Sequence, residues 1–235
     1  MSRFHHSHSL VHSLVHSLVI AFIIFITIAL FAASILPQTQ AQGGPDYLTR
    51  ALVPSLRTRS NSVLGSSVVF GLVVLTARHV IANAADSLYV YYNGALFPSQ
   101  VLCDGSNEID FGVLYAKGVP WSTVRGQSRL PELGERVWVA GYPRGLWTVR
   151  SAEVFKIEEN VEVYGERGKT ILRRIISARD RTYAVSQSGI SGGGMFNEQG
   201  ELVGIVCCVR PGEMGGGWVG AVPLIDGLSE CTGTK

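Results

Sequence analysis

A single histidine is present after residue 16 of this 235-residue chain, and any acid–base chemistry by an imidazole in the folded part must use it. This residue, His79, stands in the sequence TARHV after the apolar run Val68–Leu75. Such a run predicts a strand that ends where a loop or short helical turn begins. An imidazole at that edge can turn one side to a cleft and exchange a proton there. A structural, hydrogen-bonding histidine is the alternative interpretation.

An aspartate and a serine are suited to complete a nucleophilic site with His79. Asp110 lies in NEIDFGVL at the head of a predicted strand, where a buried carboxylate can accept from an imidazole N–H. Ser191 lies in SGISGGGMF, where glycines let successive N–H groups point at one spot while the hydroxyl stands clear. Taken singly, Asp110 could cap a turn and the glycines could be ordinary turn material. The ordered set predicts acyl transfer.

Short strands must position these residues. β-Branched and aromatic runs alternate with turn signals such as Asn93-Gly94 and Asp104-Gly105, a pattern typical of an all-β sandwich or barrel. No internal repeat indicates a solenoid or propeller. The predicted strands are Leu88–Tyr92, Ala95–Leu102, Phe111–Tyr115, Arg136–Ala140, Trp147–Val154 and Leu202–Val209.

The three motifs resemble those of the trypsin/chymotrypsin-like serine peptidases, particularly the minimal HtrA/Deg-like and glutamyl endopeptidase-like type. TARHV resembles the family's T-A-x-H motif, DFGVL its D-x-A-x-L motif and GISGG its G-x-S-G-G motif. The resemblance extends from about Ser62 to Leu224. It implies two packed, six-stranded Greek-key β-barrels, roughly Asn61–Lys117 and Leu130–Leu224, within a peptidase domain of residues 42–235.

By this resemblance the catalytic roles follow. Ser191 would attack the scissile carbonyl, His79 would take its proton and return it to the leaving amine, and Asp110 would hold the imidazole tautomer. The backbone N–H groups of Gly189 and Ser191 would form the oxyanion hole. The implied function is a serine endopeptidase that cleaves protein or peptide substrates and needs no cofactor.

The resemblance also implies where a substrate binds. Val185 would lie at the base of the primary specificity pocket, where trypsin-type enzymes have aspartate, and Cys207, Cys208 and Val209 would flank the substrate backbone. Because Val185 offers a basic side chain no counter-charge, we expect an uncharged, small to medium apolar residue on the acyl side of the cleaved bond.

Two residues next to Ser191 depart from the family pattern. Ile190 occupies the position of the aspartate that receives a newly cut N-terminus in chymotrypsin-like zymogens, so activation by that ion pair is not expected. Gly194 replaces the proline that commonly follows G-x-S-G-G, which predicts a looser loop. A catalytically inactive relative that serves as a binding or scaffold module is therefore the rival function, and processing of its own chain or of a nearby partner is a third.

Four cysteines, Cys103, Cys207, Cys208 and Cys231, allow up to two disulfides. Cys207 and Cys208 are neighbours and would face opposite ways on a regular strand. A bond between neighbours is strained, so we expect these two to be free or to pair elsewhere. A small core hydrophobe is the favoured role of a cysteine there, and a reactive thiol is the alternative.

The first 41 residues contain one charged side chain, Arg3, and a 19-residue uncharged run, Leu18–Leu36. This run predicts an apolar helix that engages a membrane or a translocon. Residues 1–41 are either a cleaved signal, which gives a secreted or periplasmic protein, or an uncleaved single-pass anchor. Three tandem HSLV repeats place His8, His12 and His16 on one face of such a helix; a low-complexity leader is favoured over a metal site.

Composition excludes several other classes of protein. The 20 Lys and Arg residues nearly balance the 18 Asp and Glu residues, so no basic face for nucleic acid is indicated. A disordered chain is excluded because 46% of the residues are hydrophobic and 16% are charged. A metal hydrolase is disfavoured because one histidine follows the leader and no H-E-x-x-H or C-x-x-C spacing is present.

Overall fold

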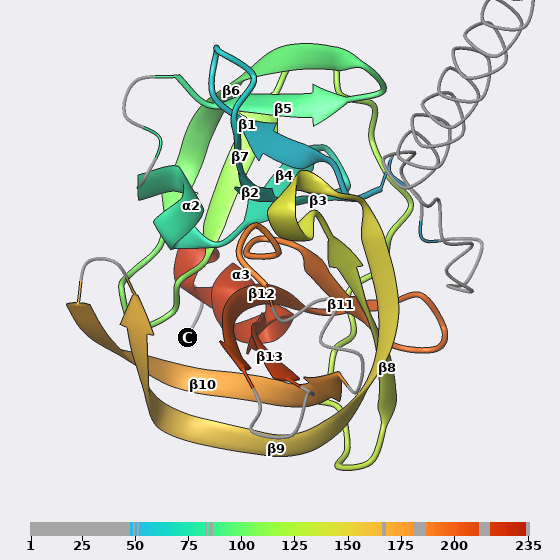
Figure 1. Ribbon diagram of the computed structural model, residues 1–235, viewed down its shortest axis with the longest axis vertical. Coiled ribbons are helices and arrows are strands. Elements are labelled where there is room, and N and C mark those ends of the chain that lie inside the picture. Colours follow the sequence, from blue (N-terminus) through green and yellow to red (C-terminus); the bar gives the residue numbers. More distant parts are fainter. Residues whose placement is uncertain are drawn as a thin grey trace, which may run out of the picture. The chain divides into compact units, whose positions relative to one another are not determined.

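Two β-sheets pack against each other between residues 42 and 235 (Figure 1). The computed structural model describes residues 48, 50, 52–82, 84, 87–165, 168–180, 187–211 and 217–233. Residues 1–41 form a separate unit. The predicted leader helix, with its signal or anchor role, lies outside the described residues, as does Val185. Within the described residues, no helix is long and apolar enough to cross a membrane.

The first sheet has seven strands and wraps round on itself. Its two edge strands, β2 and β3, are consecutive in sequence and are separated only by Ser67, so the chain itself links the edges. The Ser67 N–H and hydroxyl both donate to the Pro54 carbonyl, at 2.9 and 3.0 Å, and this fixes the bend. In sheet order the strands are β2 (Val63–Ser66), β1 (Ser55–Arg57), β5 (Tyr89–Tyr92), β6 (Ala95–Asp104), β7 (Gly112–Ala116), β4 (Val73–Thr76) and β3 (Val68–Phe70).

The second sheet is a closed, six-stranded barrel, and all its pairings are antiparallel. The all-β expectation of a chymotrypsin-like fold is confirmed, with the difference that the first half is a seven-stranded sheet interrupted at Ser67. In barrel order the strands are β10 (Gly168–Asp180), β13 (Gly217–Pro223), β12 (Leu202–Pro211), β11 (Gly194–Phe196), β8 (Arg136–Gly141) and β9 (Thr148–Gly165).

The long hairpin of β9 and β10 exceeds the sequence prediction, which ended the first strand at Val154 and contained no second one. Charged residues interrupt the apolar pattern after Val154, and pairing between the two strands compensates for them. Arg174 Nη2 lies 3.1 Å from Glu159 Oε1 on the paired strand. The hairpin therefore depends on cross-strand partners, which a pattern along one strand does not contain.

Three short helical segments complete the described fold: α2 (Arg78–Ala82), η1 (Pro143–Gly145) and α3 (Leu224–Thr232). A disulfide joins Cys103 of β6 to Cys231 of α3 across 128 residues of sequence, and Cys207 and Cys208 are free. It ties the C-terminal helix to the first sheet. A cross-link over so long a loop stabilises the native state chiefly by restricting the unfolded chain.

Candidate active site

His79 and Asp110 make a two-point contact. The His79 N–H donates to Asp110 Oδ1 at 2.8 Å, and His79 Nδ1 lies 2.8 Å from Asp110 Oδ2. The Asp110 side chain is only 14% exposed, whereas the His79 side chain is 42% exposed. The carboxylate therefore fixes both the backbone and the ring of His79, and it favours the tautomer with the proton on Nδ1. That tautomer leaves Nε2 free to accept a proton.

The backbone around these two residues is set by short local elements. His79 is the second residue of α2, which begins soon after β4 ends, as the sequence predicted. The run Val68–Leu75, however, forms the two paired strands β3 and β4 and not one strand. Asp110 ends a turn in which its N–H donates to the Ser106 carbonyl at 3.0 Å, and its φ of 46° is left-handed. Aspartate tolerates this conformation better than most side chains do. The next residue, Phe111, is fully buried, and its ring packs against Gly227 of α3. This packing holds the C-terminal end of the turn in place.

Ser191 is half-buried and lies beside the same region. A β-carbon at residue 65 would lie 2.9 Å from both the Ser191 carbonyl oxygen and a Val80 methyl group. Gly65 therefore lies between the serine loop and α2, where a side chain would not fit. A β-carbon at Gly192 would meet the Thr76 hydroxyl at 2.3 Å, at the end of β4. Glycine at these positions lets the serine loop reach the element that carries His79.

The carbonyl groups of four successive residues, 188–191, are each held by a hydrogen-bond donor. All four bonds have donor–acceptor distances of 2.8 or 2.9 Å. The bonds are from Arg144 N–H to Ser188 O, from Ser66 Oγ–H to Gly189 O, from Gly193 N–H to Ile190 O and from Ser66 N–H to Ser191 O.

These bonds orient the two N–H groups that the sequence assigned to an oxyanion hole. Because a trans peptide holds its N–H opposite its carbonyl, the bond to Ser188 O fixes the direction of the Gly189 N–H, and the bond to Ile190 O fixes that of the Ser191 N–H. Neither N–H bonds to an acceptor among the described residues. Both are available to stabilise negative charge on a bound oxygen.

The two departures from the family pattern are accommodated by packing. Ile190 is fully buried in the core of the second barrel, and its Cδ1 lies 2.5 Å from where a β-carbon at Gly141 would be. Gly194 lies in β11, paired with Ala140 and Ile205, and the Phe196 ring occupies the space of its missing side chain. The expectation of a looser loop is therefore not met at Gly194.

Ser66 is a site residue that the sequence analysis missed. It is fully buried in β2, and its hydroxyl donates to Gly189 O at 2.8 Å while accepting from the Tyr142 N–H at 2.8 Å. A serine in a strand carries no sequence signal for this task, because its partners lie 76 and 123 residues away. Arg144 is a second such residue: its N–H holds the Ser188 carbonyl, from a left-handed φ of 51°.

Replacing Ser66 by alanine should lower both stability and reactivity of the serine loop. The partly buried Gly189 O and the buried Tyr142 N–H would each lose their partner, and an unsatisfied buried group costs about 1–3 kcal/mol. We expect a fluorophosphonate to label Ser191 about tenfold more slowly. Ser67→Ala is the matched control, because it removes a neighbouring buried hydroxyl that bonds only Pro54. Equal labelling rates for the two variants would contradict an orienting role of Ser66.

Cys207 and Cys208 do not face opposite ways, so that expectation was wrong. The pairing of β12 with β13 shifts between Val206 and Cys208, which makes Cys207 the extra residue of a β-bulge. The two sulfur atoms lie 3.0 Å apart as free thiols, as expected from the strain of a bond between neighbours. Burial raises the pKa of Cys207 well above its usual value, and the neighbouring thiol and Asp110 act in the same direction. Cys207 is therefore held as a neutral thiol.

The strand that carries Cys207, Cys208 and Val209 has an open edge. Residues 206–211 of β12 pair with β13 on one side, whereas β11, on the other side, reaches only Ile205. The serine loop bonds both main-chain groups of Val206 on that side, through Gly192 and Gly193, and no described strand covers the edge beyond Val206. An extended peptide could add there by main-chain hydrogen bonds.

In the described part of the chain, no group of three His, Cys, Asp or Glu side chains is placed to hold a metal ion.

Comparison with known proteins gives a consistent result. The family model of the trypsin-like peptidase domain matches residues 63–205. Serine endoprotease DegS of Haemophilus influenzae is 30% identical over 147 residues, which are 60% of this chain and 40% of DegS. This chain thus corresponds to less than half the length of that relative.

Solved structures share the fold. The active form of the Rv3671c protease from M. tuberculosis superposes with a TM-score of 0.63 at 22% identity, over 80% of this chain and 83% of that one. The HtrA-type protease AlgW with a decapeptide gives 0.55 at 24% identity, over 73% and 51%. With the family model covering more than half of the residues, the chain belongs to the trypsin-like peptidase domain family, among the serine peptidases.

Proposed function

We propose that this chain is a serine endopeptidase that forms an acyl-enzyme with Ser191. His79 acts as general base and then as general acid, and Asp110 holds its tautomer and stabilises its cation. The observation that carries the proposal is the two-point contact of Asp110 with His79, at 2.8 Å for each hydrogen bond, on an element separated from the serine loop only by Gly65. This contact supports the role of Asp110 in orienting the imidazole of His79, from which it is 31 residues away in sequence.

The oxyanion hole of the proposal consists of the N–H groups of Gly189 and Ser191. Support comes from the anchored carbonyls of residues 188–191, which keep both groups aimed without any cost of rearrangement during reaction. One such donor typically contributes about 3 kcal/mol to the transition state. Binding of the acyl side of the substrate along Cys208 and Val209 is supported by the open edge of β12.

For specificity we propose an uncharged, small to medium apolar residue on the acyl side of the cleaved bond. By the resemblance, Val185 would lie at the base of the corresponding pocket, and its side chain is uncharged. A peptide library with all residue types at that position measures the preference. Efficient cleavage after Arg or Lys would reject it.

We further infer that the chain acts after export. The apolar run Leu18–Leu36 supports engagement of a translocon, and the Cys103–Cys231 disulfide is typical of an oxidising compartment. Intact-mass analysis of the protein recovered from producing cells distinguishes a removed leader from a retained anchor. A full-length protein with both of these thiols reduced would contradict export.

Fluorophosphonate labelling tests the proposed function directly. The full chain should be labelled, whereas Ser191→Ala and His79→Ala should not, because the reagent needs an activated serine. Ser151→Ala, at an exposed serine of β9, is the matched control and should be labelled like the parent. A folded parent that resists the reagent would favour the rival function of a catalytically inactive binding module.

A further inference from the structure

A cavity of about 440 Å³ lies between the two sheets, away from the His79–Asp110 pair. Its first wall comes from the first sheet, with Arg57 of β1 and Tyr91 of β5. Its second wall comes from the segment around η1, with Tyr142 and Trp147. Arg50 lies at its rim and is exposed. We call this cavity the arginine pocket.

The arginine pocket adjoins the oxyanion loop directly. The Tyr142 N–H bonds to the Ser66 hydroxyl that holds Gly189 O, and a β-carbon at Gly189 would lie 2.6 Å from Tyr142 O. The open edge of β12, proposed to bind the acyl side, meets the serine loop at another point, where Gly192 N–H bonds to Val206 O at 2.7 Å. Because the acyl side would occupy the edge of β12, the chain that follows the scissile bond leaves the serine elsewhere, and we take its path to run past Gly189 to the arginine pocket.

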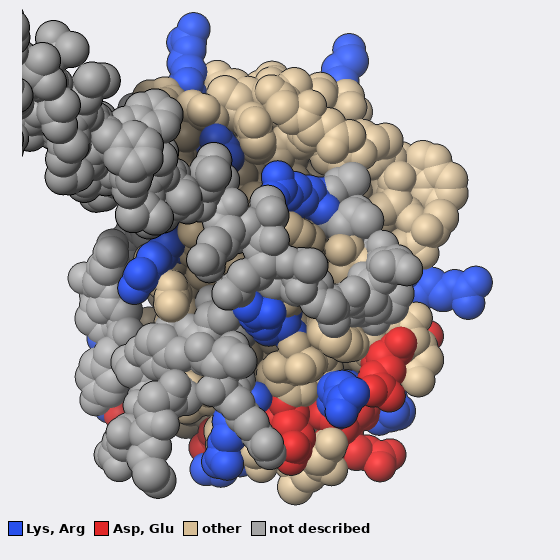
Figure 2. Space-filling view, turned by 45° about the vertical axis from the view of Figure 1, so that its right-hand side comes forward, with Lys and Arg blue, Asp and Glu red and all other residues tan. Residues whose placement is uncertain are grey.

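The described residues of the pocket carry positive charge without a carboxylate to balance it. The polar partners of Arg57 are neutral, because its Nε donates to the Ser55 hydroxyl at 3.0 Å and its Nη1 to Asn61 Oδ1 at 2.8 Å. Its guanidinium also stacks over the Tyr91 ring at 3.8 Å, which holds it in one orientation. No Asp or Glu is among the described residues that line the pocket. In the view of Figure 2, the surface drawn in colour over the first sheet, in the upper part of the picture, shows blue Lys and Arg side chains and no red ones.

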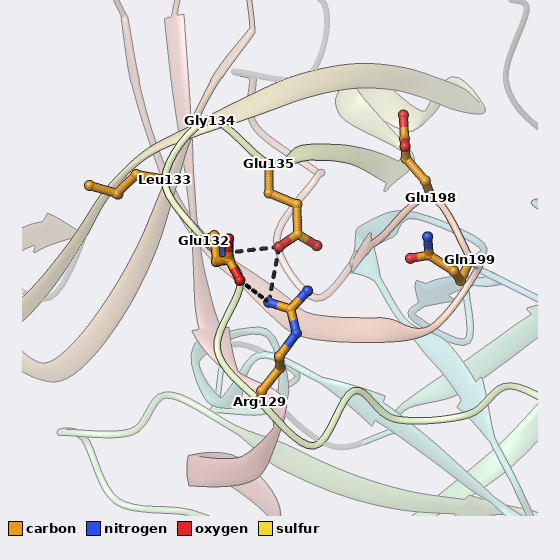
Figure 3. Close-up of a pocket in the computed structure, with 7 residues that line it drawn as sticks. All are labelled: Arg129, Glu132, Leu133, Gly134, Glu135, Glu198 and Gln199. Carbon is orange, nitrogen blue, oxygen red and sulfur yellow. Dashed lines mark hydrogen bonds and ion pairs between the residues drawn. The ribbon is translucent and has the colours of Figure 1, made fainter.

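A second cavity of similar volume, about 410 Å³, shows the contrast. Its arginine, Arg129, lies 3.2 Å from Glu135 Oε2 and 3.9 Å from Glu132 Oε1, so its charge is satisfied within the wall (Figure 3). An anion has little to gain there. The arginine pocket, with two cations and no carboxylate among its described lining residues, attracts an anion instead.

We propose that the arginine pocket binds the carboxylate of an acidic substrate residue on the leaving-group side of the cleaved bond. Arg50 and Arg57 supply the charge, and the rings of Tyr91, Tyr142 and Trp147 cover the methylene groups of a Glu or Asp side chain. Tyr142 adds a phenol that stays protonated and can donate, because burial raises its pKa despite the two arginines. This inference rests on the proposed function for the direction in which the substrate lies.

Peptide binding to the full chain carrying Ser191→Ala tests the pocket without requiring catalysis. The probes are fluorescein-labelled octapeptides with Val before the cleavage position and Glu at the second, third or fourth place after it, each matched by a Gln peptide. Anisotropy should show about fivefold tighter binding of Glu than of Gln at one of these places, the ratio of a partly exposed ion pair. The preference should weaken at about 0.5 M salt, where screening is strong.

Variants of the two arginines assign the effect. Arg50→Gln with Arg57→Gln should remove the preference, Arg57→Lys should keep most of it, and Arg136→Gln, at an exposed arginine of β8, should leave it unchanged. A ratio near one at all three places, or a preference that survives the double variant, would overturn the proposal. Tighter binding of inorganic phosphate than of the Glu peptide would also overturn it, in favour of a free-anion site.

The two proposals fail separately. Fluorophosphonate labelling of the parent reports whether Ser191 is activated, whereas the Glu-to-Gln ratio with Ser191→Ala does not depend on that chemistry. A labelled parent with a ratio of one keeps the endopeptidase and removes the acidic preference. An unlabelled parent with a fivefold ratio removes the endopeptidase and keeps the pocket as a carboxylate site.

Discussion

Replacing Ser191 or His79 by alanine should lower the kcat/KM of peptide hydrolysis by about a millionfold, and replacing both should cost little more. The reason is that the two side chains act as one unit: the hydroxyl is a weak nucleophile until the imidazole takes its proton, and the imidazole has no proton to take without the hydroxyl. Hydrolysis of a chromogenic peptide by the full chain measures the loss. The residual rate should reflect the oxyanion hole and substrate binding alone.

Folding of these variants can be checked independently. Ser191 is half-buried and only its backbone bonds to Ser66, so Ser191→Ala should melt within a few degrees of the parent. Additive losses, in which the double variant falls far below either single one, would contradict a shared proton transfer. A single variant that keeps more than about a tenth of the parent's activity would mean that another serine or another base does the chemistry.

Replacing Asp110 by asparagine should lower kcat/KM by about ten thousandfold while the fold is retained. The two contacts of Asp110 with His79 both need an acceptor, one for the backbone N–H and one for Nδ1–H. Asparagine has a single acceptor oxygen. If that oxygen keeps the backbone N–H, its NH₂ group faces Nδ1 and favours the tautomer with the proton on Nε2, which cannot accept a proton from Ser191.

Asparagine is a fair substitute for Asp110 in shape. It tolerates the left-handed φ of 46° that this position requires, whereas alanine would add backbone strain. Asp226→Asn is the matched control, because Asp226 of α3 pairs with Arg174 of β10 and not with His79. This variant should change kcat/KM less than twofold. Loss of activity together with collapse of the thermal transition would assign Asp110 a structural role instead of an orienting one.

Several strands could be predicted from the local sequence alone, because their own apolar residues mark them as strands. The runs around Tyr89–Tyr92, Arg136–Gly141 and Leu202–Pro211 alternate or bury enough apolar surface to be predicted from periodicity alone. The β9–β10 hairpin was only partly predicted. Its charged residues form pairs across the hairpin, such as Arg174 with Glu159, and these pairs are not visible in the pattern of one strand. The bulge at Cys207 was missed because it depends on register with β13.

For the site, the sequence by itself determined the chemical types and their order: one histidine after a strand, one aspartate at the head of a strand and one serine among glycines. These features are local, because each depends on the residues immediately around it. Tertiary structure alone decided that Asp110 reaches His79, that buried Ser66 orients Gly189, and that Cys103 pairs with Cys231. Each of these contacts joins residues distant in sequence, and their positions follow from how two sheets and a C-terminal helix pack together.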